Sequence, residues 1–307
     1  MPRFSIVLPC FNAASTLPAT INSIAAQSCQ DWELICVDDG STDATLDIIT
    51  ERATHDPRIH AVSNPGKGPS DARNHGALEI ARGEIIAFCD ADDLWSPTKL
   101  EEQDRAFADL CLDATFGQTA FFQDRPDTAK VYSTVPAGPV TIPMLLGENP
   151  VCTMSNMSVR RRAFLATGGF DTDMVHNEDL DWLIRLVGSG ADLRGVDRTQ
   201  VWYRTSRNGL SSNLAAMRLG RQQALETAAR FGFEPDARAE AIHLRYLARR
   251  VLRLNGNPGD AIRLVAAGLA NSPSGFLLPV RRGAATAIAA FVAPFLPNGV
   301  RKALFTR

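Results

Sequence analysis

The sequence FCDADDLW, residues 88–95, places three carboxylates directly after an apolar run, residues 85–89, that predicts a buried strand. Carboxylates gathered at the end of such a strand repel one another, and a hard divalent cation removes that cost through oxygen ligands. An alternative interpretation is a solvated acidic turn before the helix that Ser96 and Pro97 predict. This segment alone leaves both interpretations open.

A second acidic segment, VDDGSTD at residues 37–43, also follows an apolar run. The chain from Phe4 alternates strand-like with helix-like segments, which predicts an α/β fold with a mostly parallel central sheet and helices on both faces. We expect strands in FSIVLP, WELICVD, IHAVS and EIIAFCD, and helices over residues 14–27, 43–54 and 70–81.

Ligands of such sheets bind at the carboxyl ends of the strands. Four of these ends, residues 9–12, 38–43, 64–71 and 90–93, carry carboxylates, amides and glycines that we expect to face one crevice. Neither GxGxxG nor GxxxxGK[ST] occurs in the sequence. The pattern therefore excludes a dinucleotide-binding Rossmann domain and a P-loop.

The second half of the chain changes character near residue 210. Residues 113–141 and 151–159 predict further strands, HNEDLDWLIRLVGSG at residues 176–190 a helix that begins with acids, and 199–205 a returning strand. Apolar positions spaced by three and four then predict helices over 214–231, 236–254 and 258–270. We therefore expect one domain over residues 1–210 and a helical C-terminal region over 211–307.

The composition, 307 residues with 45% hydrophobic content, is that of a globular protein with one large core. Six scattered cysteines without CxxC spacing predict reduced thiols, and the absence of a secretory leader pattern predicts a cytoplasmic protein. Residues 1–216 carry 18 Lys and Arg against 29 Asp and Glu, whereas residues 217–307 carry 14 against 5. The acidic front argues against nucleic acid as a partner.

An apolar stretch near the C-terminus, GAATAIAAFVAPFLP at residues 283–297, lies between Arg281-Arg282 and Arg301-Lys302. It is too short to span a bilayer, and its basic flanks favour peripheral contact with a membrane surface. A core helix or a homodimer helix is the alternative interpretation.

The ordered motifs make residues 3–210 resemble a family 2 glycosyltransferase of the GT-A fold. The resemblance rests on FSIVLPCFN at the first strand, WELICVDDGSTD at the second, GPSDARNHGA, the DxD motif in FCDADDLW, and GGFD followed by NEDLDWLIRL. The chain has Thr205-Ser206 where the family often has a His after its late strand. It also lacks the QxxRW signature of processive synthases, which favours transfer of one sugar at a time.

The resemblance implies a role for each motif residue. Asp92 is the expected ligand of a Mn²⁺ or Mg²⁺ ion, with Asp90 as second ligand or near the ribose. Asp179 is the expected catalytic base, with Glu178 as runner-up. The residues assigned to nucleotide-sugar binding are Pro9, Phe11, Asn12, Asp39, Arg73, Asp90 and Ala91.

The expected reaction is inverting transfer of a single sugar from a UDP-sugar to a hydroxyl of a glycan or a polyprenyl-linked acceptor, in cell-surface polysaccharide synthesis. A departing diphosphate builds negative charge that a divalent ion neutralises, and an acceptor hydroxyl needs a base. Such an acceptor would place the enzyme at the inner face of the cytoplasmic membrane. Alternatives are a non-catalytic nucleotide-sugar-binding or scaffold protein and a nucleotidyltransferase, which would also use paired acids and Mg²⁺.

Overall fold

The computed structural model describes residues 1–205 and 213–305, and these divide into two compact units. Unit 1 comprises Met1–Val140 and Pro150–Thr227, and unit 2 comprises Thr141–Asn149 and Ala228–Arg307. The predicted boundary at residue 210, like Ser206, lies outside the described residues and stays a prediction.

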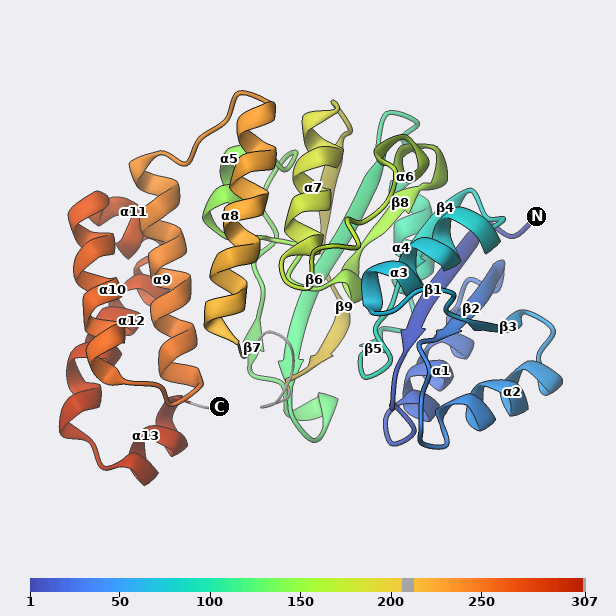
Figure 1. Cartoon of the computed structure of the whole chain (residues 1–307), viewed down its shortest axis with the longest axis horizontal. Coiled ribbons are helices and arrows are strands. Elements are labelled where there is room, and N and C mark those ends of the chain that lie inside the picture. Colours follow the sequence, from blue (N-terminus) through green and yellow to red (C-terminus); the bar gives the residue numbers. More distant parts are fainter. Residues whose placement is uncertain (206–212, 306–307) are drawn as a thin grey trace. The chain divides into compact units, whose positions relative to one another are not determined.

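Unit 1 is built on one sheet, to which nine strands of the described residues contribute (Figure 1). The strand order is β3-β2-β1-β4-β8-β6-β9-β5, with β7 paired to β6. The pairs among β3, β2, β1 and β4 are parallel, whereas β8 runs antiparallel to both β4 and β6. The strands are β1 (Phe4–Cys10), β2 (Trp32–Asp38), β3 (Ile59–Ser63), β4 (Ile85–Phe88), β5 (Leu94–Trp95), β6 (Ala114–Phe122), β7 (Val131–Tyr132), β8 (Ser158–Arg160) and β9 (Leu193–Arg204).

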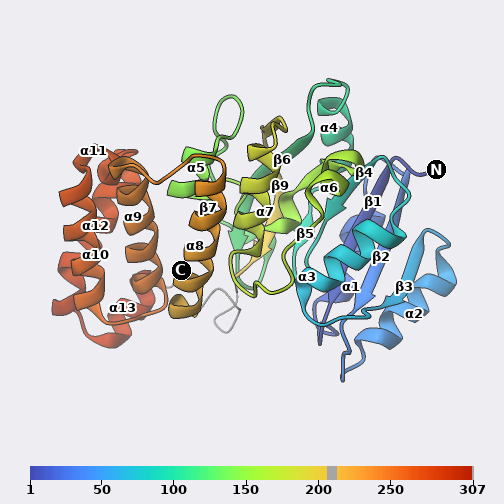
Figure 2. The ribbon, with the colours of Figure 1, turned by 45° about the horizontal axis from the view of Figure 1, so that its top comes forward.

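Helices cover both faces of this sheet, which confirms the predicted α/β fold. Alternate residues of β1 and β2 pack against α1, α2 and α4 on one face, and α3, α6 and α7 lie over the other (Figures 1 and 2). The helices of unit 1 are α1 (Leu17–Ala25), α2 (Thr45–His55), α3 (Pro69–Asn74), α4 (Lys99–Ala106), α6 (Arg161–Thr167), α7 (Glu178–Gly188) and α8 (Leu214–Arg230), with the π-helical turn η1 (His75–Ile80) and the 3₁₀ turns η2 (Pro126–Thr128) and η3 (Met154–Asn156).

Three local predictions need correction. The helix expected over residues 70–81 changes to a π-helical turn at His75, where Gly76 lies so close to the sheet that a Cβ would be 2.6 Å from Val7 Cγ1. The helix expected from Ser96 begins only at Lys99, because Leu94 and the next residue pair with β9 as strand β5. Of the strand expected over 151–159, only the end is a strand, and η3 precedes it.

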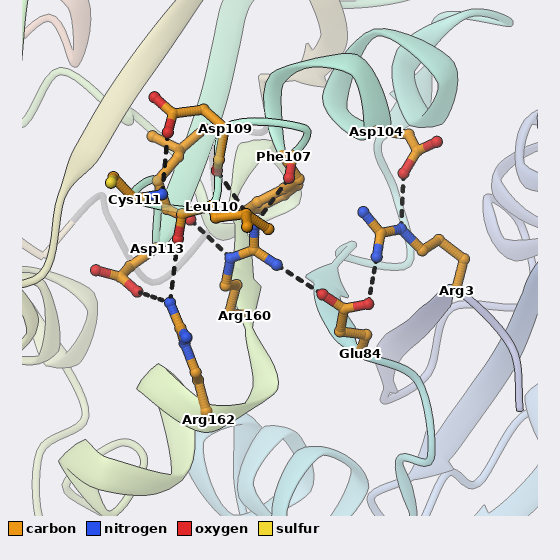
Figure 3. A network of polar contacts seen from close by, with 11 residues as sticks. Arg3, Glu84, Asp104, Phe107, Asp109, Leu110, Cys111, Asp113, Arg160 and Arg162 are labelled. Carbon is orange, nitrogen blue, oxygen red and sulfur yellow. Dashed lines mark hydrogen bonds and ion pairs between the residues drawn. The ribbon is translucent and has the colours of Figure 1, made fainter.

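An arginine network holds the edge of the sheet where β1 and β4 begin (Figure 3). Arg160, which is 4% exposed, donates from Nη1 to Glu84 Oε1 at 2.6 Å and from Nε to the carbonyl of Leu112 at 2.8 Å. Its Nη2 donates to the carbonyl of Phe107 at 2.8 Å, and Glu84 also pairs with Arg3. The buried guanidinium therefore joins β8, β4 and the end of α4 at this edge.

Unit 2 is helical, as the sequence predicts for this part of the chain. Glu148 pairs with Arg245 Nη2 at 3.4 Å and with Arg282 Nη1 at 3.3 Å, which joins the segment after α5 to α9 and α12. Among the described residues of the chain, no helix is long and apolar enough to cross a membrane. The helices of unit 2 are α5 (Ile142–Gly147), α9 (Ala237–Arg253), α10 (Pro258–Asn271), α11 (Pro273–Leu277), α12 (Val280–Val292), the 3₁₀ turn η5 (Ala293–Phe295) and α13 (Asn298–Phe305).

Candidate functional site

The carboxyl ends of β1, β2 and β4 lie side by side at one edge of the sheet. Strand β1 pairs in parallel register with β2 and with β4, so that Cys10 is opposite Asp38 and Val7 is opposite Phe88. The side chains that follow these strands therefore gather at a single edge. The chain places there the segments with Phe11 and Asn12, with Asp39, and with Asp90 to Asp93.

The last carboxylate of the acidic loop (residues 89–93) anchors this loop to neighbouring segments. Asp93 is fully buried, and its Oδ2 accepts a hydrogen bond from Ser155 Oγ at 2.5 Å while its Oδ1 accepts one from the backbone N–H of Arg204 at 2.9 Å. Burial raises the pKa of Asp93 well above the ordinary value of a carboxyl. Asp93 thus fixes the loop against η3 and the end of β9, and it has no exposed surface to offer a ligand.

Asp90 and Asp92 are the partly exposed carboxylates of the acidic loop. Burial, and then the charge of Asp90, raise the pKa of Asp92 to about 6. Asp90 has an ion pair with Arg73, whose Nη2 lies 2.7 Å from Asp90 Oδ1, and its Oδ2 accepts a hydrogen bond from Thr153 Oγ1 at 3.3 Å. The protein therefore compensates the negative charge of Asp92 less than that of Asp90.

Arg73, on α3, connects the acidic loop to the helix that begins with acids. The side chain is 7% exposed, and its second terminal nitrogen, Nη1, lies 3.3 Å from Glu178 Oε1. Two carboxylates from distant parts of the sequence, residues 90 and 178, thus share one guanidinium. Arg73 Nε is buried without a hydrogen-bond partner, so the guanidinium is not saturated by these two contacts.

Glu178 and Asp179 occupy the first turn of α7. Burial, together with the charge of Asp179, raises the pKa of Glu178 to about 7, and burial raises that of Asp179 also. The positive charge of Arg73 acts in the opposite direction on both carboxyls. Two adjacent acids with raised pKa values beside a buried arginine are an arrangement suited to accept a proton near neutral pH.

A cluster of aromatic rings fixes the distance between α7 and the acidic loop. Phe88 precedes the loop by one residue, and its ring centroid lies 5.4 Å from those of Phe164 and Phe170 and 6.3 Å from that of Trp182. Trp182 lies one turn after the two acids on α7, and its Nε1 donates to Thr167 Oγ1 at 2.9 Å. These buried rings make the relative position of the two acidic segments a consequence of core packing.

The loops at β1 and β2 hold the residues assigned to nucleotide binding. Asp39 accepts hydrogen bonds from Asn64 Nδ2 at 2.6 Å and from the backbone N–H of Gly68 at 2.9 Å, which fixes its carboxylate. Asn12 has a left-handed backbone, with φ 47°, and its Oδ1 accepts from the N–H of Thr42 at 2.8 Å. Phe11 is 57% exposed beside it. Asn12 therefore shapes the loop, and Phe11 presents its ring to solvent.

The remaining assigned residues, Pro9 and Ala91, differ in what they offer. Pro9 is a half-buried member of β1, and Ala91 is 8% exposed with its carbonyl accepting a hydrogen bond from Thr20 Oγ1 at 3.1 Å. Arg73 brings Asp90 and Glu178 into one network, whereas no hydrogen bond or ion pair of the described residues joins Pro9, Phe11 or Asn12 to that network. The geometry therefore comprises an acidic half and a half formed by the loops after β1 and β2.

The acidic loop is supported by three further residues, Thr153, Ser155 and Arg204. The sequence did not predict a role for them. Ser155 Oγ accepts the backbone N–H of Asp90 at 2.9 Å, and Arg204 Nε donates to the carbonyl of Asp92 at 3.0 Å. The hydroxyls lie in a segment, VCTMSNMSV, whose apolar residues predict a strand. Polar residues inside an otherwise apolar run were the signal that could have revealed them.

The donor set of the acidic loop fits a hard divalent cation. Asp90 and Asp92 offer carboxylate oxygens, and the described residues contain no group of three or more His, Cys, Asp or Glu side chains arranged to hold a metal. A cation here would take one or two ligands from the chain and the others from water and phosphate oxygens, as Mg²⁺ commonly does.

The comparison with protein families matches residues 5–167 of this chain to the model described as glycosyl transferase family 2. A putative teichuronic acid biosynthesis glycosyltransferase, TuaG of Bacillus subtilis, is 31% identical over 215 residues, which are 69% of this chain and 82% of the relative. The Escherichia coli protein WfaP, named a UDP-Glc:α-D-GlcNAc-diphosphoundecaprenol β-1,3-glucosyltransferase, is 28% identical over 226 residues, 69% of this chain and 81% of the relative.

Solved structures share the fold. TarS of S. aureus, residues 1–349 in complex with UDP-GlcNAc, has a TM-score of 0.61 at 17% identity, and the match covers 95% of this chain and 91% of residues 1–349 of TarS. The mannosyltransferase PcManGT of Pyrobaculum calidifontis, in complex with GDP-Man and Mn²⁺, has a TM-score of 0.61 at 22% identity, covering 99% of this chain and 84% of that protein. These similarities establish the GT-A-like fold.

Proposed function

We propose a single-sugar transfer reaction for this chain, which belongs to glycosyl transferase family 2. The donor is a UDP-sugar, and the acceptor is a hydroxyl of a glycan or of a polyprenyl-linked sugar in the synthesis of a cell-surface polysaccharide. The observation that carries the proposal is the guanidinium of Arg73, which contacts both Asp90 at the DxD motif and Glu178 beside the predicted base. The Arg73 side chain thus links the carboxylate expected to bind the donor to the helix turn expected to act on the acceptor.

On the donor side, Asp92, with Asp90, would hold a Mn²⁺ or Mg²⁺ ion. When bound, this ion neutralises the charge that grows on the diphosphate as its bond to the anomeric carbon breaks. Because Asp90 is already paired with Arg73, Asp92 is the stronger candidate for the principal ligand. Arg73 supplies a fixed positive charge next to the same diphosphate, in a buried setting where such a charge acts strongly.

On the acceptor side, Asp179 takes the proton of the attacking hydroxyl. Glu178 is less available for that task, because its Oε1 faces Arg73 at 3.3 Å. The acceptor oxygen forms its bond to the anomeric carbon as the diphosphate leaves from the opposite side, and the hydroxyl proton passes to the Asp179 carboxylate. A single displacement of this kind inverts the configuration at the anomeric carbon.

The half of the site formed by the loops after β1 and β2 favours uridine. Asp39 already accepts hydrogen bonds from Gly68 and Asn64, but the two oxygens of a carboxylate offer about four acceptor positions. The remaining positions can accept the imide N–H of uracil. The exposed ring of Phe11 at the same strand edge supplies an apolar surface for a base or a sugar.

The acceptor class is drawn from the relatives. WfaP is named for a diphosphoundecaprenol-linked acceptor, and TuaG for teichuronic acid biosynthesis. We infer that this chain acts on a similar glycan or lipid-linked glycan. Such an acceptor would place the reaction in the cytoplasm at the inner face of the cytoplasmic membrane.

A transfer assay with Asp179→Asn tests this function and its non-catalytic alternative together. The variant should bind the UDP-sugar as the intact protein does and lose at least a thousandfold in kcat, because the hydroxyl then has no base. The matched control is Asp173→Asn, which changes an exposed carboxylate before α7 and should leave kcat within twofold. Unchanged transfer by Asp179→Asn would remove this residue as the base. Donor binding by an intact protein that transfers no sugar to any glycan or lipid-linked acceptor would favour the non-catalytic alternative.

A further inference from the structure

The outward side of α12 is apolar although no part of the described chain covers it. The inward side buries Gly283, Thr286 and Ala290. Outside this buried side, Ile288 is 63% exposed and Phe291 is 50% exposed, although side chains of these types are usually buried. The same chemistry continues through η5 and α13. We use the name α12–α13 face for the exposed apolar residues of these three elements, which are Val280, Ile288, Phe291, Val292, Phe295, Val300 and Leu304.

Helix α13 buries none of its residues. It has only eight residues, and isolated helices of that length are marginal in water. Its apolar side chains Val300 and Leu304 are 42% and 60% exposed, and Phe295, just before it, is 86% exposed. A helix and a turn with this pattern gain most of their stabilisation only when an external surface covers them.

The charge of this part of the chain identifies the kind of surface. Residues 261–307 contain no Asp or Glu, but they contain five Arg and one Lys. Arg281 lies on the same side of α12 as Ile288 and Val292, and Lys302 is exposed on the side of α13 opposite to Val300 and Leu304. A partner that pairs with this face must therefore supply negative charge as well as apolar contact.

We propose that the α12–α13 face docks on an anionic lipid bilayer, with α12 and α13 lying in the interface. Phenylalanine and leucine enter the boundary of the acyl chains, while Arg281 and Lys302 contact lipid phosphates. A symmetric dimer through this face would place the cations of one copy against those of the other, and residues 261–307 supply no carboxylate to compensate them. The proposal goes beyond sugar transfer and does not depend on the donor.

Vesicle co-sedimentation of the full-length protein tests the proposal. The intact protein should bind vesicles of 70% phosphatidylcholine and 30% phosphatidylglycerol at low salt, and bind pure phosphatidylcholine at least tenfold more weakly. Phe291→Ala with Phe295→Ala should lower the partition coefficient at least tenfold. Arg281→Gln with Lys302→Gln should lower it about thirtyfold, at about 1 kcal/mol for each cation near an anionic surface.

Two controls in the same unit match these variants. Phe231→Ala with Phe233→Ala removes two exposed rings that lie before α9, and Arg263→Gln removes an exposed arginine of α10 that pairs with Asp260. Both should bind vesicles within twofold of the intact protein, and the circular dichroism spectrum and thermal unfolding of every variant check that its helices are intact. Absence of binding to anionic vesicles, or equal losses in the controls, would overturn the proposal. Sedimentation that reveals a dimer lost in the Phe291→Ala, Phe295→Ala variant, without vesicle binding, would replace the lipid by a second copy.

Discussion

At the scale of single residues, the candidate site depends on how one buried arginine is shared. Arg73 compensates Asp90 and Glu178 at once, and it opposes the rise in pKa that burial causes in Glu178 and Asp179. Its removal would therefore raise the pKa of both acids further. The arginine thus favours the ionised form of the two acids against the effect of burial.

The pH profile of transfer checks this account of Arg73. Because burial raises the pKa of both acids, kcat/KM should decrease as pH falls, and this acid limb should lie above the pH range of an ordinary carboxyl. Arg73→Gln should move this limb to higher pH. Arg73→Lys keeps the charge and should leave the limb near its place. An identical profile in Arg73→Gln would contradict a role of its charge in setting the base.

At the scale of elements, the acidic strand ends could be predicted from the sequence, but the side chains that hold them in place could not. Apolar runs followed by acids sufficed to place Asp39 and Asp90 at one sheet edge, because parallel neighbours β1, β2 and β4 follow from the alternating pattern. The support from Ser155 could not be foreseen, since its segment has the composition of a strand but forms η3. The bridge through Arg73 was equally hidden, because residues 73 and 178 are far apart in sequence and only packing brings them together.

The aromatic cluster between α7 and β4 was also beyond sequence reasoning. Its members come from four segments, and each alone has the composition of ordinary core. Their function is to set where the first turn of α7 meets the acidic loop. The catalytic geometry therefore depends on packing below the site as well as on the residues within it.

Trp182→Leu tests the dependence on packing. Loss of most of this fully buried ring should lower the free energy of unfolding by about 3 kcal/mol, measured by urea denaturation. It should also lower kcat more than the affinity for UDP, because α7 carries the proposed base while the proposed nucleotide contacts lie after β1 and β2. The matched control is Leu165→Ala, which shortens an exposed side chain of α6 and should change both quantities little. Equal losses of UDP affinity and kcat in Trp182→Leu would argue against a specific positioning role.

At the scale of the whole molecule, a polar network holds the sheet at the end where β1 and β4 begin, and the candidate site lies where these strands end. Arg160 closes this edge by contacts to Glu84 and to main-chain carbonyls, all within unit 1 (Figure 3). In this parallel part of the sheet, the contacts of Arg160 stabilise the end where the strands begin, and the candidate site residues lie where the strands end.

Arg160→Met should therefore reduce stability and spare the active site. Removal of the guanidinium leaves the buried carbonyls of Leu112 and Phe107 without their donor, and we expect a loss of about 3 kcal/mol in the free energy of unfolding. Arg162→Met, at a neighbouring arginine with a side chain 68% exposed, should cost less than about 0.5 kcal/mol. Urea denaturation measures both. Comparable losses in the two variants would refute the special weight of the buried network.

The central claim is that the acidic loop holds the diphosphate of a UDP donor through a cation on Asp92. Calorimetric titration of UDP in the presence of Mn²⁺ tests it most directly. The intact protein should bind UDP with an affinity that falls at least a hundredfold when EDTA replaces Mn²⁺, and Asp92→Ala should bind equally weakly with or without the ion. The control Asp173→Asn should bind as the intact protein does. UDP binding by Asp92→Ala that is as tight and as dependent on Mn²⁺ as in the intact protein would contradict the account.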